Sequence, residues 1–270
     1  MAYVRTRLGR WFYDERGPEK GPVVVLAHGL LFDRTMWNAQ IEPLTALGAR
    51  VLAADGPGHG MSEVPPPFSL DDHARAFVDA LDAWKVERAV LVGLSGGGML
   101  AMRVALSAPS RVRAIVLADT TARAEPRKNR VKYRALASFE KSFGIPESLA
   151  RSQIGPLLFS DASLRKDPAL FDRWYRRMVG FSRLGMYRAA RAVVIDRPDI
   201  LGKLGGIKAP ALVLCGRDDR AQPMIESEKI AEAIPGAKLA VLADSGHMTA
   251  LENPAEFNAE MVPFVKAHLA

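Results

Sequence analysis

Short runs of apolar residues recur along the chain and are separated by longer stretches of mixed polarity. The runs span residues 23–26, 50–54, 89–92, 114–118, 211–215 and 239–242. Runs of this length between turn residues are typical of strands that are buried on both faces of a mainly parallel sheet. The stretches between them carry apolar residues at helical spacing. This alternation predicts an α/β fold, with a mainly parallel central sheet flanked by helices.

Two segments depart from this alternation. Polar and apolar residues alternate at positions 4–7 and 10–13, on either side of Gly9, which predicts a hairpin at the edge of the sheet. Between residues 121 and 200 the strand-like runs stop, and arginine, methionine and aromatic residues recur at helical spacing. We therefore predict a helical insertion in this second segment, between two neighbouring strands.

The run that ends at Val92 is followed by Gly-Leu-Ser-Gly-Gly at positions 93–97 and then by a helix-like stretch from Met99 to Ser107. A Gly-x-Ser-x-Gly turn between a strand and a helix holds a serine hydroxyl exposed at the end of a sheet. The turn is so tight that side chains at its two outer glycines would collide with neighbouring backbone. Ser95 is therefore the candidate nucleophile.

A serine is a weak nucleophile at neutral pH, so Ser95 needs a base and an acid that orients the base. His247 lies in a polar loop after the run 239–242, and Asp219 follows the run 211–215. These positions give the order serine, acid, histidine along the chain. A carboxylate at Asp219 would accept the Nδ1 proton of His247 and stabilise the imidazolium that forms when the serine attacks.

A glycine-rich turn after a strand can also cradle a phosphate. Gly96, Gly98 and Ala101 fit a loose dinucleotide-binding fingerprint, with Asp119 about one helix and one strand further on. That fingerprint leaves His247 without a role. We therefore expect no nucleotide cofactor.

Four motifs together resemble the α/β-hydrolase family, and the resemblance covers nearly the whole chain. They are His28-Gly29-Leu30, which matches the oxyanion loop of the family, the Asp-x-x-Gly-x-Gly-x-Ser turn from Asp55 to Ser62, the serine turn at 93–97, and the histidine segment from His247 to Glu252 with Pro254 and Phe257. The resemblance implies the α/β-hydrolase fold. It also implies that residues 1–120 and 201–270 form the core and that residues 121–200 form an inserted helical cap.

The resemblance further implies an oxyanion hole made by two backbone N–H groups, those of Leu30 and Gly96. The stretch from His28 to Trp37 looks like the branch that contains esterases, enol-lactonases and cofactor-free haloperoxidases. The function implied is a serine hydrolase that cleaves carboxylic esters or lactones through an acyl-enzyme, with no metal and no organic cofactor. A perhydrolase or haloperoxidase with the same triad is one alternative. A non-catalytic small-molecule receptor on the same fold is another.

Two other aspartates compete with Asp219 for the role of the acid. Asp218 lies between arginines, which favours a turn or ion-pair role. Asp119 ends an earlier strand-like run, and some family members draw their acid from that strand. The position of Asp219, three residues after Gly216 and four before Pro223, resembles the usual spacing. We therefore favour Asp219.

The composition suits one globular unit, because the 270 residues are 49% hydrophobic. The one cysteine, Cys215, cannot form an internal disulfide and favours a reducing compartment. No run of signal-peptide length begins the sequence, and no segment approaches about 20 apolar residues. We expect a cytoplasmic protein whose partner is a small-molecule ester or lactone, with no nucleic acid and no membrane. The sequence leaves open whether the chain forms a homo-oligomer.

The positive net charge of +7 lies in the predicted cap, where residues 121–200 carry 17 Lys and Arg against 8 Asp and Glu. One hypothesis is that this charge attracts a substrate that bears a free carboxylate. The alternative is a solvated outer face, since Arg173, Arg176 and Arg177 recur at helical spacing. Candidates for an apolar pocket wall are Leu30, Leu31, Phe32, Met99, Phe139, Phe143, Trp174, Met178 and Met186.

Overall fold

The computed structural model describes residues 2–269 and contains one eight-stranded sheet with the order β1-β2-β4-β3-β5-β6-β7-β8. Strands β3 to β8 pair in parallel, whereas β1 pairs antiparallel with β2, and β2 with β4. The predicted parallel sheet and its edge hairpin are therefore confirmed. The strands are β1 (Ala2–Thr6), β2 (Gly9–Arg16), β3 (Val23–Ala27), β4 (Arg50–Ala54), β5 (Ala89–Leu94), β6 (Val112–Ala118), β7 (Ala211–Gly216) and β8 (Lys238–Leu242).

Helices cover both faces of the sheet because successive side chains of each central strand point to opposite sides. In β3, Val23 and Val25 pack in the core beneath α2 and α3, whereas Val24 and Leu26 pack in the core beneath α12. All four valine and leucine side chains are buried, which explains why the strand reads as a continuous apolar run. The helices around the sheet are η1 (Arg34–Trp37), α1 (Asn38–Thr45), α2 (Leu70–Ala83), α3 (Gly96–Ser107), η2 (Pro109–Arg111), η5 (Leu201–Gly206), α10 (Met224–Ala233), α11 (Thr249–Glu252) and α12 (Pro254–Ala267).

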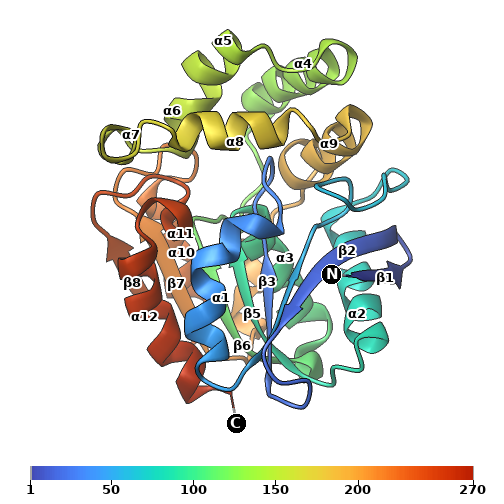
Figure 1. Ribbon diagram of the computed structural model, residues 1–270, viewed down its shortest axis with the longest axis vertical. Helices are drawn as coiled ribbons and strands as arrows, with labels where there is room; N and C mark the ends of the chain where they lie inside the picture. The colour runs from blue at the N-terminus through green and yellow to red at the C-terminus, as the bar shows by residue number, and fades with distance from the viewer. Residues whose placement is uncertain (1, 270) are drawn as a thin grey trace.

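The remaining helices follow one another between β6 and β7 and lie together at one end of the sheet (Figure 1). The chain enters and leaves this region side by side, since the Ile200 N–H donates to the Ala122 carbonyl at 2.8 Å. We call residues 121–200 the cap, and its exact bounds stay a prediction. Its helices are α4 (Arg127–Phe143), α5 (Glu147–Leu149), η3 (Ala150–Ile154), α6 (Gly155–Leu158), α7 (Asp161–Lys166), α8 (Leu170–Met178), α9 (Arg183–Ala190) and η4 (Arg191–Ile195).

The predicted apolar wall is partly wrong in the cap. Trp174, Met178 and Met186 are buried, and their place in a pocket wall stays a prediction, but Phe139 and Phe143 are 43% and 72% exposed on α4. Their rings pack against each other, with centroids 5.1 Å apart. Helical spacing placed these two aromatic residues on one face, and that face points to solvent. Among residues 2–269, no helix is long and apolar enough to cross a membrane.

Candidate active site

Ser95 occupies the sharp turn that joins β5 to α3. Its backbone has φ 54° and ψ −113°, a strained conformation for a residue with a side chain. The turn requires its two outer glycines, because a Cβ on Gly93 would lie 2.3 Å from the Gly97 backbone and a Cβ on Gly97 would lie 2.0 Å from the Ala27 carbonyl. The Ser95 N–H donates to the Ala118 carbonyl at 2.8 Å. These contacts fix the side chain at the carboxyl end of the sheet.

The structure brings together the three side chains that the sequence singled out. His247 Nε2 lies 3.0 Å from Ser95 Oγ, and His247 Nδ1 lies 2.8 Å from Asp219 Oδ2. The histidine and the aspartate are almost fully buried, at 4% and 6% exposure. The second oxygen, Oδ1, of Asp219 accepts the N–H groups of Ala221 and Gln222, each at 2.8 Å. The loop after β7 thus orients the carboxylate before any substrate is present.

The Asp219 carboxylate also shifts the pKa of the His247 imidazole. Burial on its own would disfavour a charged ring, but the charge and hydrogen bond of Asp219 outweigh it. Together with the charges of Asp119 and Glu252, they raise the pKa of His247 above its usual 6.5. Because a carboxylate can only accept, Nδ1 carries the proton and Nε2 of the neutral ring is free to accept one from Ser95. This is the tautomer that a general base needs.

Two backbone N–H groups lie beside the serine. Gly96 begins α3, and a Cβ on it would lie 3.6 Å from the Leu30 nitrogen. Within residues 2–269, neither N–H donates a hydrogen bond to a protein acceptor. The loop that holds Leu30 is fixed by His28, whose Nδ1–H donates to the Gly29 carbonyl at 2.8 Å and whose Nε2 accepts the Gly56 N–H at 2.7 Å. The two donors predicted for an oxyanion hole are therefore adjacent and available.

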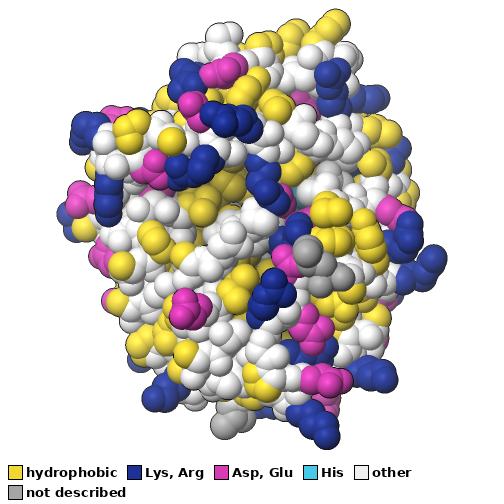
Figure 2. Space-filling view, viewed as in Figure 1, with side chains coloured by type: hydrophobic (Ala, Val, Ile, Leu, Met, Phe, Trp, Pro, Cys, Tyr) yellow, Lys and Arg dark blue, Asp and Glu magenta, His cyan; other side chains and the backbone are white. Residues whose placement is uncertain are grey.

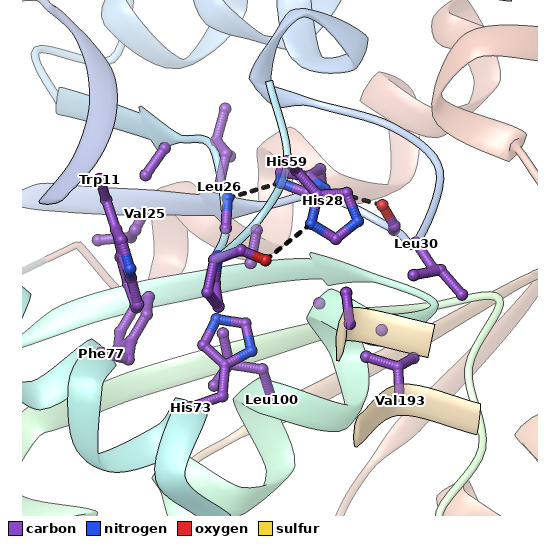
Figure 3. A pocket seen from close by; sticks show the side chains of 18 of the residues that line it. Trp11, Val25, Leu26, His28, Leu30, His59, His73, Phe77, Leu100 and Val193 are labelled. Carbon is purple, nitrogen blue, oxygen red and sulfur yellow. Dashed lines mark hydrogen bonds between the residues drawn. The ribbon is translucent and has the colours of Figure 1, made fainter. Parts of the chain in front are cut away.

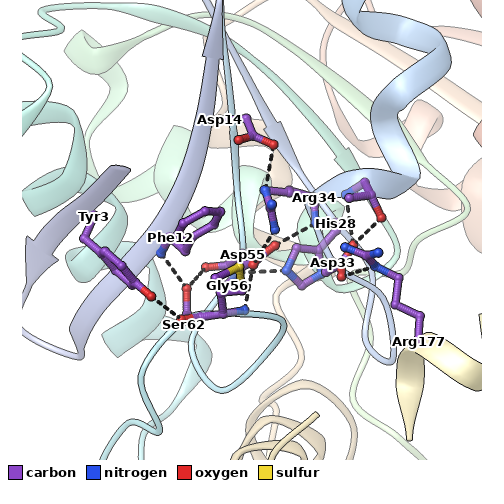
Figure 4. Close-up of polar contacts among 12 residues, drawn as sticks. Tyr3, Phe12, Asp14, His28, Asp33, Arg34, Asp55, Gly56, Ser62 and Arg177 are labelled. Carbon is purple, nitrogen blue, oxygen red and sulfur yellow. Dashed lines mark hydrogen bonds and ion pairs between the residues drawn. The ribbon is translucent and has the colours of Figure 1, made fainter. Parts of the chain in front are cut away.

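Two ion pairs hold the segment that follows the oxyanion loop (Figure 4). Arg34 is 7% exposed and pairs with both Asp14 and Asp55, at 2.8 and 2.9 Å. Asp55 is fully buried and also accepts the N–H groups of Arg34 and Met61. The turn that begins at Asp55 therefore binds the segment that follows the oxyanion loop. The sequence identified this turn as a family motif, but nothing in it predicted Arg34 as the partner.

The cap contacts the oxyanion loop directly. Trp174 Nε1–H, on α8, donates to the Leu31 carbonyl at 3.1 Å. Arg177, one turn further along α8, pairs with the buried Asp33. Asp33 itself caps η1 through the Thr35 N–H. One helix of the cap is therefore tied to both the donor loop and the short helix behind it.

Asp119, the alternative acid, lies close to the site but makes different contacts. Its Oδ1 accepts the Gly216 N–H at 2.8 Å and its Oδ2 accepts the Thr249 hydroxyl. Burial, and then the negative charge of Asp219, raise the pKa of Asp119 well above its usual value. The geometry therefore favours Asp219 as the partner of His247. Asp119 instead fixes the loops that carry these two residues.

Glu252 is a buried carboxylate that the sequence identified only as part of a motif. It accepts the N–H groups of Gly246 and Met248, the two neighbours of His247, at 3.0 and 2.9 Å. It also accepts the N–H of Ser160, a cap residue, at 2.8 Å. Three donors therefore converge on one acceptor group. The carboxylate fixes the backbone on both sides of His247 and joins it to the cap.

We expect Glu252→Gln to lower kcat about tenfold with little change in KM, and to lower the melting temperature by about 5 °C. The amide NH₂ of glutamine would face at least one of the three N–H donors, so a buried donor would lose its acceptor. Steady-state kinetics and thermal melting check this. Glu260→Gln, an exposed substitution on α12, is the matched control. Native kcat in the Glu252 variant would contradict the positioning role.

Three histidines cluster behind the oxyanion loop. The rings of His28 and His59 lie 4.8 Å apart, and the ring of His73 packs edge-on against Trp11 and Phe68. Burial, followed by the nearby His28, lowers the pKa of His73 to about 3. The same two causes hold the pKa of His59 well below 6.5. His59 and His73, with their lowered pKa values, are neutral supports of the fold at pH 7.

We expect this cluster to make the protein acid-sensitive. Because the folded pKa of His73 is below the unfolded value of 6.5, the unfolded chain binds more protons below that pH. The contribution of His73 to the free energy of unfolding is therefore fully present above pH 6.5. It is lost as the pH falls toward 3. Urea unfolding at pH 7 and pH 4 measures how much the free energy of unfolding drops between the two pH values. In His73→Phe this drop should be smaller than in the native protein by about 2–3 kcal/mol. His268→Phe, at the end of α12, should leave the loss intact. Equal acid losses in the native protein and His73→Phe would contradict the prediction.

Comparison with known proteins places this geometry in a family. A sequence model of the alpha/beta hydrolase fold matches residues 22–254. The chain belongs to the α/β-hydrolase family. This α/β-hydrolase is 27% identical to 3-oxoadipate enol-lactonase 1 of Acinetobacter baylyi, over 93% of the chain and 91% of that protein.

Two solved structures share nearly the whole fold of this α/β-hydrolase. A thermophilic esterase from Thermogutta terrifontis has a TM-score of 0.92 at 27% identity, with 100% of each chain covered. The enol-lactonase from Burkholderia xenovorans LB400 has a TM-score of 0.90 at 27% identity, covering 98% of this chain and 99% of that one. The fold and family that the sequence motifs implied are confirmed. In the described part of the chain, no group of three or more His, Cys, Asp or Glu side chains is placed to hold a metal ion.

Proposed function

We propose that this α/β-hydrolase is a serine hydrolase that cleaves carboxylic ester or lactone bonds through an acyl-enzyme. One observation carries the proposal: a continuous hydrogen-bonded chain runs from Ser95 through His247 to Asp219, with steps of 3.0 and 2.8 Å. Relatives named as an enol-lactonase and an esterase support the same reaction class. Ser95 is the nucleophile, His247 the general base and acid, and Asp219 the residue that orients the imidazole.

Acylation begins when Ser95 Oγ attacks the carbonyl carbon and His247 Nε2 takes its proton. Asp219 stabilises the imidazolium through the Nδ1–H bond. The carbonyl oxygen becomes an oxyanion, which the N–H groups of Leu30 and Gly96 bind. Preorganised donors of this kind contribute about 10²–10³-fold each to the rate. His247 then gives the proton to the leaving oxygen, and the carbon–oxygen bond of the ester breaks.

Deacylation repeats these steps with water in place of the serine. His247 takes a proton from the water as it attacks the acyl carbon, the same two N–H groups bind the oxyanion, and the proton returns to Ser95 Oγ as the acid leaves. For a lactone, the leaving alcohol remains attached to the acyl chain and departs with it. This chemistry uses only side chains, backbone and water, so it requires no metal or organic cofactor.

The experiment that tests the proposal is hydrolysis of p-nitrophenyl acetate and ring opening of a simple lactone, with a chelator present. We expect turnover of both kinds of substrate. A parallel assay with hydrogen peroxide and bromide tests the haloperoxidase alternative, which predicts peroxide-dependent halogenation that exceeds hydrolysis. Absence of turnover on every ester and lactone would contradict the proposed function.

A further inference from the structure

A cavity of about 40 Å³ borders the two residues whose N–H groups form the candidate oxyanion hole (Figure 3). Leu30 and Gly96, which carry those donors, both line it. Val193 and Leu30 lie on one side of it, and Trp11 and Phe77 on the other. A carbonyl group whose oxygen is bound by these donors would lie beside this cavity, although neither Ser95 nor His247 lines it. The acyl chain attached to that carbonyl is the part of a substrate that can reach into it.

The lining of this cavity carries no charge at neutral pH. Within the described residues, no Asp, Glu, Lys or Arg side chain lines it. Its three histidines are His28, whose two ring nitrogens are both hydrogen-bonded, and His59 and His73, whose pKa values are held far below 7 by burial. His59 Nε2 and His73 Nδ1 are inaccessible to solvent, so they do not face the open space. The cavity thus offers an incoming group no cation to pair with.

The positive charge of the cap lies elsewhere. The cap contributes only Ala189 and Val193 to the cavity lining. Of its Lys and Arg residues, Arg197 alone is buried in the described structure, and it pairs with Glu125. Arg177, the cap arginine at the oxyanion loop, pairs with Asp33. On the face in Figure 2, basic side chains of the cap lie on the outer surface with acidic ones between them. The cap charge therefore does not reach the acyl side of the site.

We propose that this cavity holds the acyl chain of the substrate and selects a short, uncharged chain, rejecting one that ends in a carboxylate. The proposal rests on the proposed function, because it assigns a substrate class to the same site. Space of this size takes about three non-hydrogen atoms, the tail of a butyryl group beyond its carbonyl. A carboxylate placed there would lose its hydration and gain no partner. The cap charge suggested a substrate with a free carboxylate. For the acyl side of the substrate, we propose instead a chain without charge.

The first test compares three p-nitrophenyl esters on the native protein. The butyrate fits the cavity. The hemisuccinate and the 4-oxopentanoate each carry five non-hydrogen atoms beyond the ester carbonyl and have nearly the same shape, so they overfill the cavity equally and differ in the charge of the terminal group. We expect kcat/KM to be highest for the butyrate. We expect the 4-oxopentanoate to exceed the hemisuccinate by about 100-fold or more, since only charge separates them. Equal rates for these two, or a preference for the hemisuccinate, would overturn the proposal.

The second test locates the selection in this cavity. Leu100→Ala removes a lining side chain on α3, and Val104→Ala removes a buried side chain one turn along the same helix that does not line the cavity. We expect the preferred acyl length to rise from four carbons to about six in the first variant and to stay unchanged in the second. An unchanged preference in Leu100→Ala would overturn the location.

The two proposals fail in distinguishable ways. Turnover that depends on Ser95 but favours the hemisuccinate would leave the proposed function in place. It would contradict the proposal that the cavity selects an uncharged acyl chain. If none of the three esters, nor any other ester or lactone, is turned over in a Ser95-dependent way, both proposals fall. The Ser95→Ala protein, assayed beside the native one, separates these cases.

Discussion

Replacing Ser95 by alanine should lower kcat for p-nitrophenyl acetate by about 10⁴–10⁶-fold. The substitution removes the hydroxyl that is proposed to form the acyl-enzyme, while His247, Asp219 and the proposed oxyanion donors stay in place. What remains is the residual rate that binding and the two N–H donors give to direct attack by water. Release of p-nitrophenol by native and variant protein, at matched concentration, measures the difference.

The Ser95→Ala protein should remain folded, which makes the kinetic result interpretable. Alanine keeps the Cβ that the turn already accommodates, and the backbone bond from residue 95 to Ala118 does not involve the hydroxyl. We expect a melting temperature within a few degrees of the native one. Ser148→Ala, an exposed substitution on α5, is the matched control and should keep native kcat. Retained hydrolysis in Ser95→Ala would remove the serine from the mechanism.

The second large effect is expected from Asp219→Asn, which should lower kcat by about 10³–10⁴-fold. An asparagine amide can donate to His247 Nδ1, so the ring would hold its proton on Nε2 and could not accept one from Ser95. Asp218→Asn is the matched control, because Asp218 is adjacent in sequence and exposed. It should keep native kcat. Equal losses in the two variants would contradict a specific role for Asp219.

The pH dependence gives the same pair a second readout. His247 must be neutral to accept the serine proton, so kcat/KM should rise with pH through an apparent pKa above 6.5, the direction in which Asp219 shifts it. In Asp219→Asn that midpoint should move to lower pH, because the negative charge is lost. Asp119→Asn should move it much less, since Asp119 makes no hydrogen bond to His247. A larger shift in the Asp119 variant would make Asp119 the acid.

Much of the fold could be predicted because buried strands leave a direct trace in sequence. The run at 23–26 is apolar at every position because both faces of β3 are covered by helices. The serine turn was equally readable, since Gly93 and Gly97 occupy positions where any Cβ would overlap backbone. The candidate triad could be predicted because each of its residues follows a strand and the ends of parallel strands meet at one edge.

The supporting contacts could not be predicted, because they join segments whose separation in sequence carries no information. Glu252 meets Ser160 across 92 positions, and Arg34 meets Asp55 across 21. Helical spacing likewise groups Phe139 with Phe143 but does not say whether a partner covers them, and the structure leaves both exposed. The net charge of the cap can be counted from the sequence. Whether its arginines face the cavity or the solvent depends on which side of each helix packs toward the cavity.

Trapping the intermediate shows directly whether Ser95 carries the acyl group. Native protein would be mixed with an excess of p-nitrophenyl butyrate, quenched in acid within milliseconds and analysed by peptide mass spectrometry, with Ser95→Ala as the control. We expect a burst of about one equivalent of p-nitrophenol and one butyryl group on the peptide that contains Ser95. A burst with the butyryl group on another residue, or turnover with no acylated peptide at any time, would contradict it.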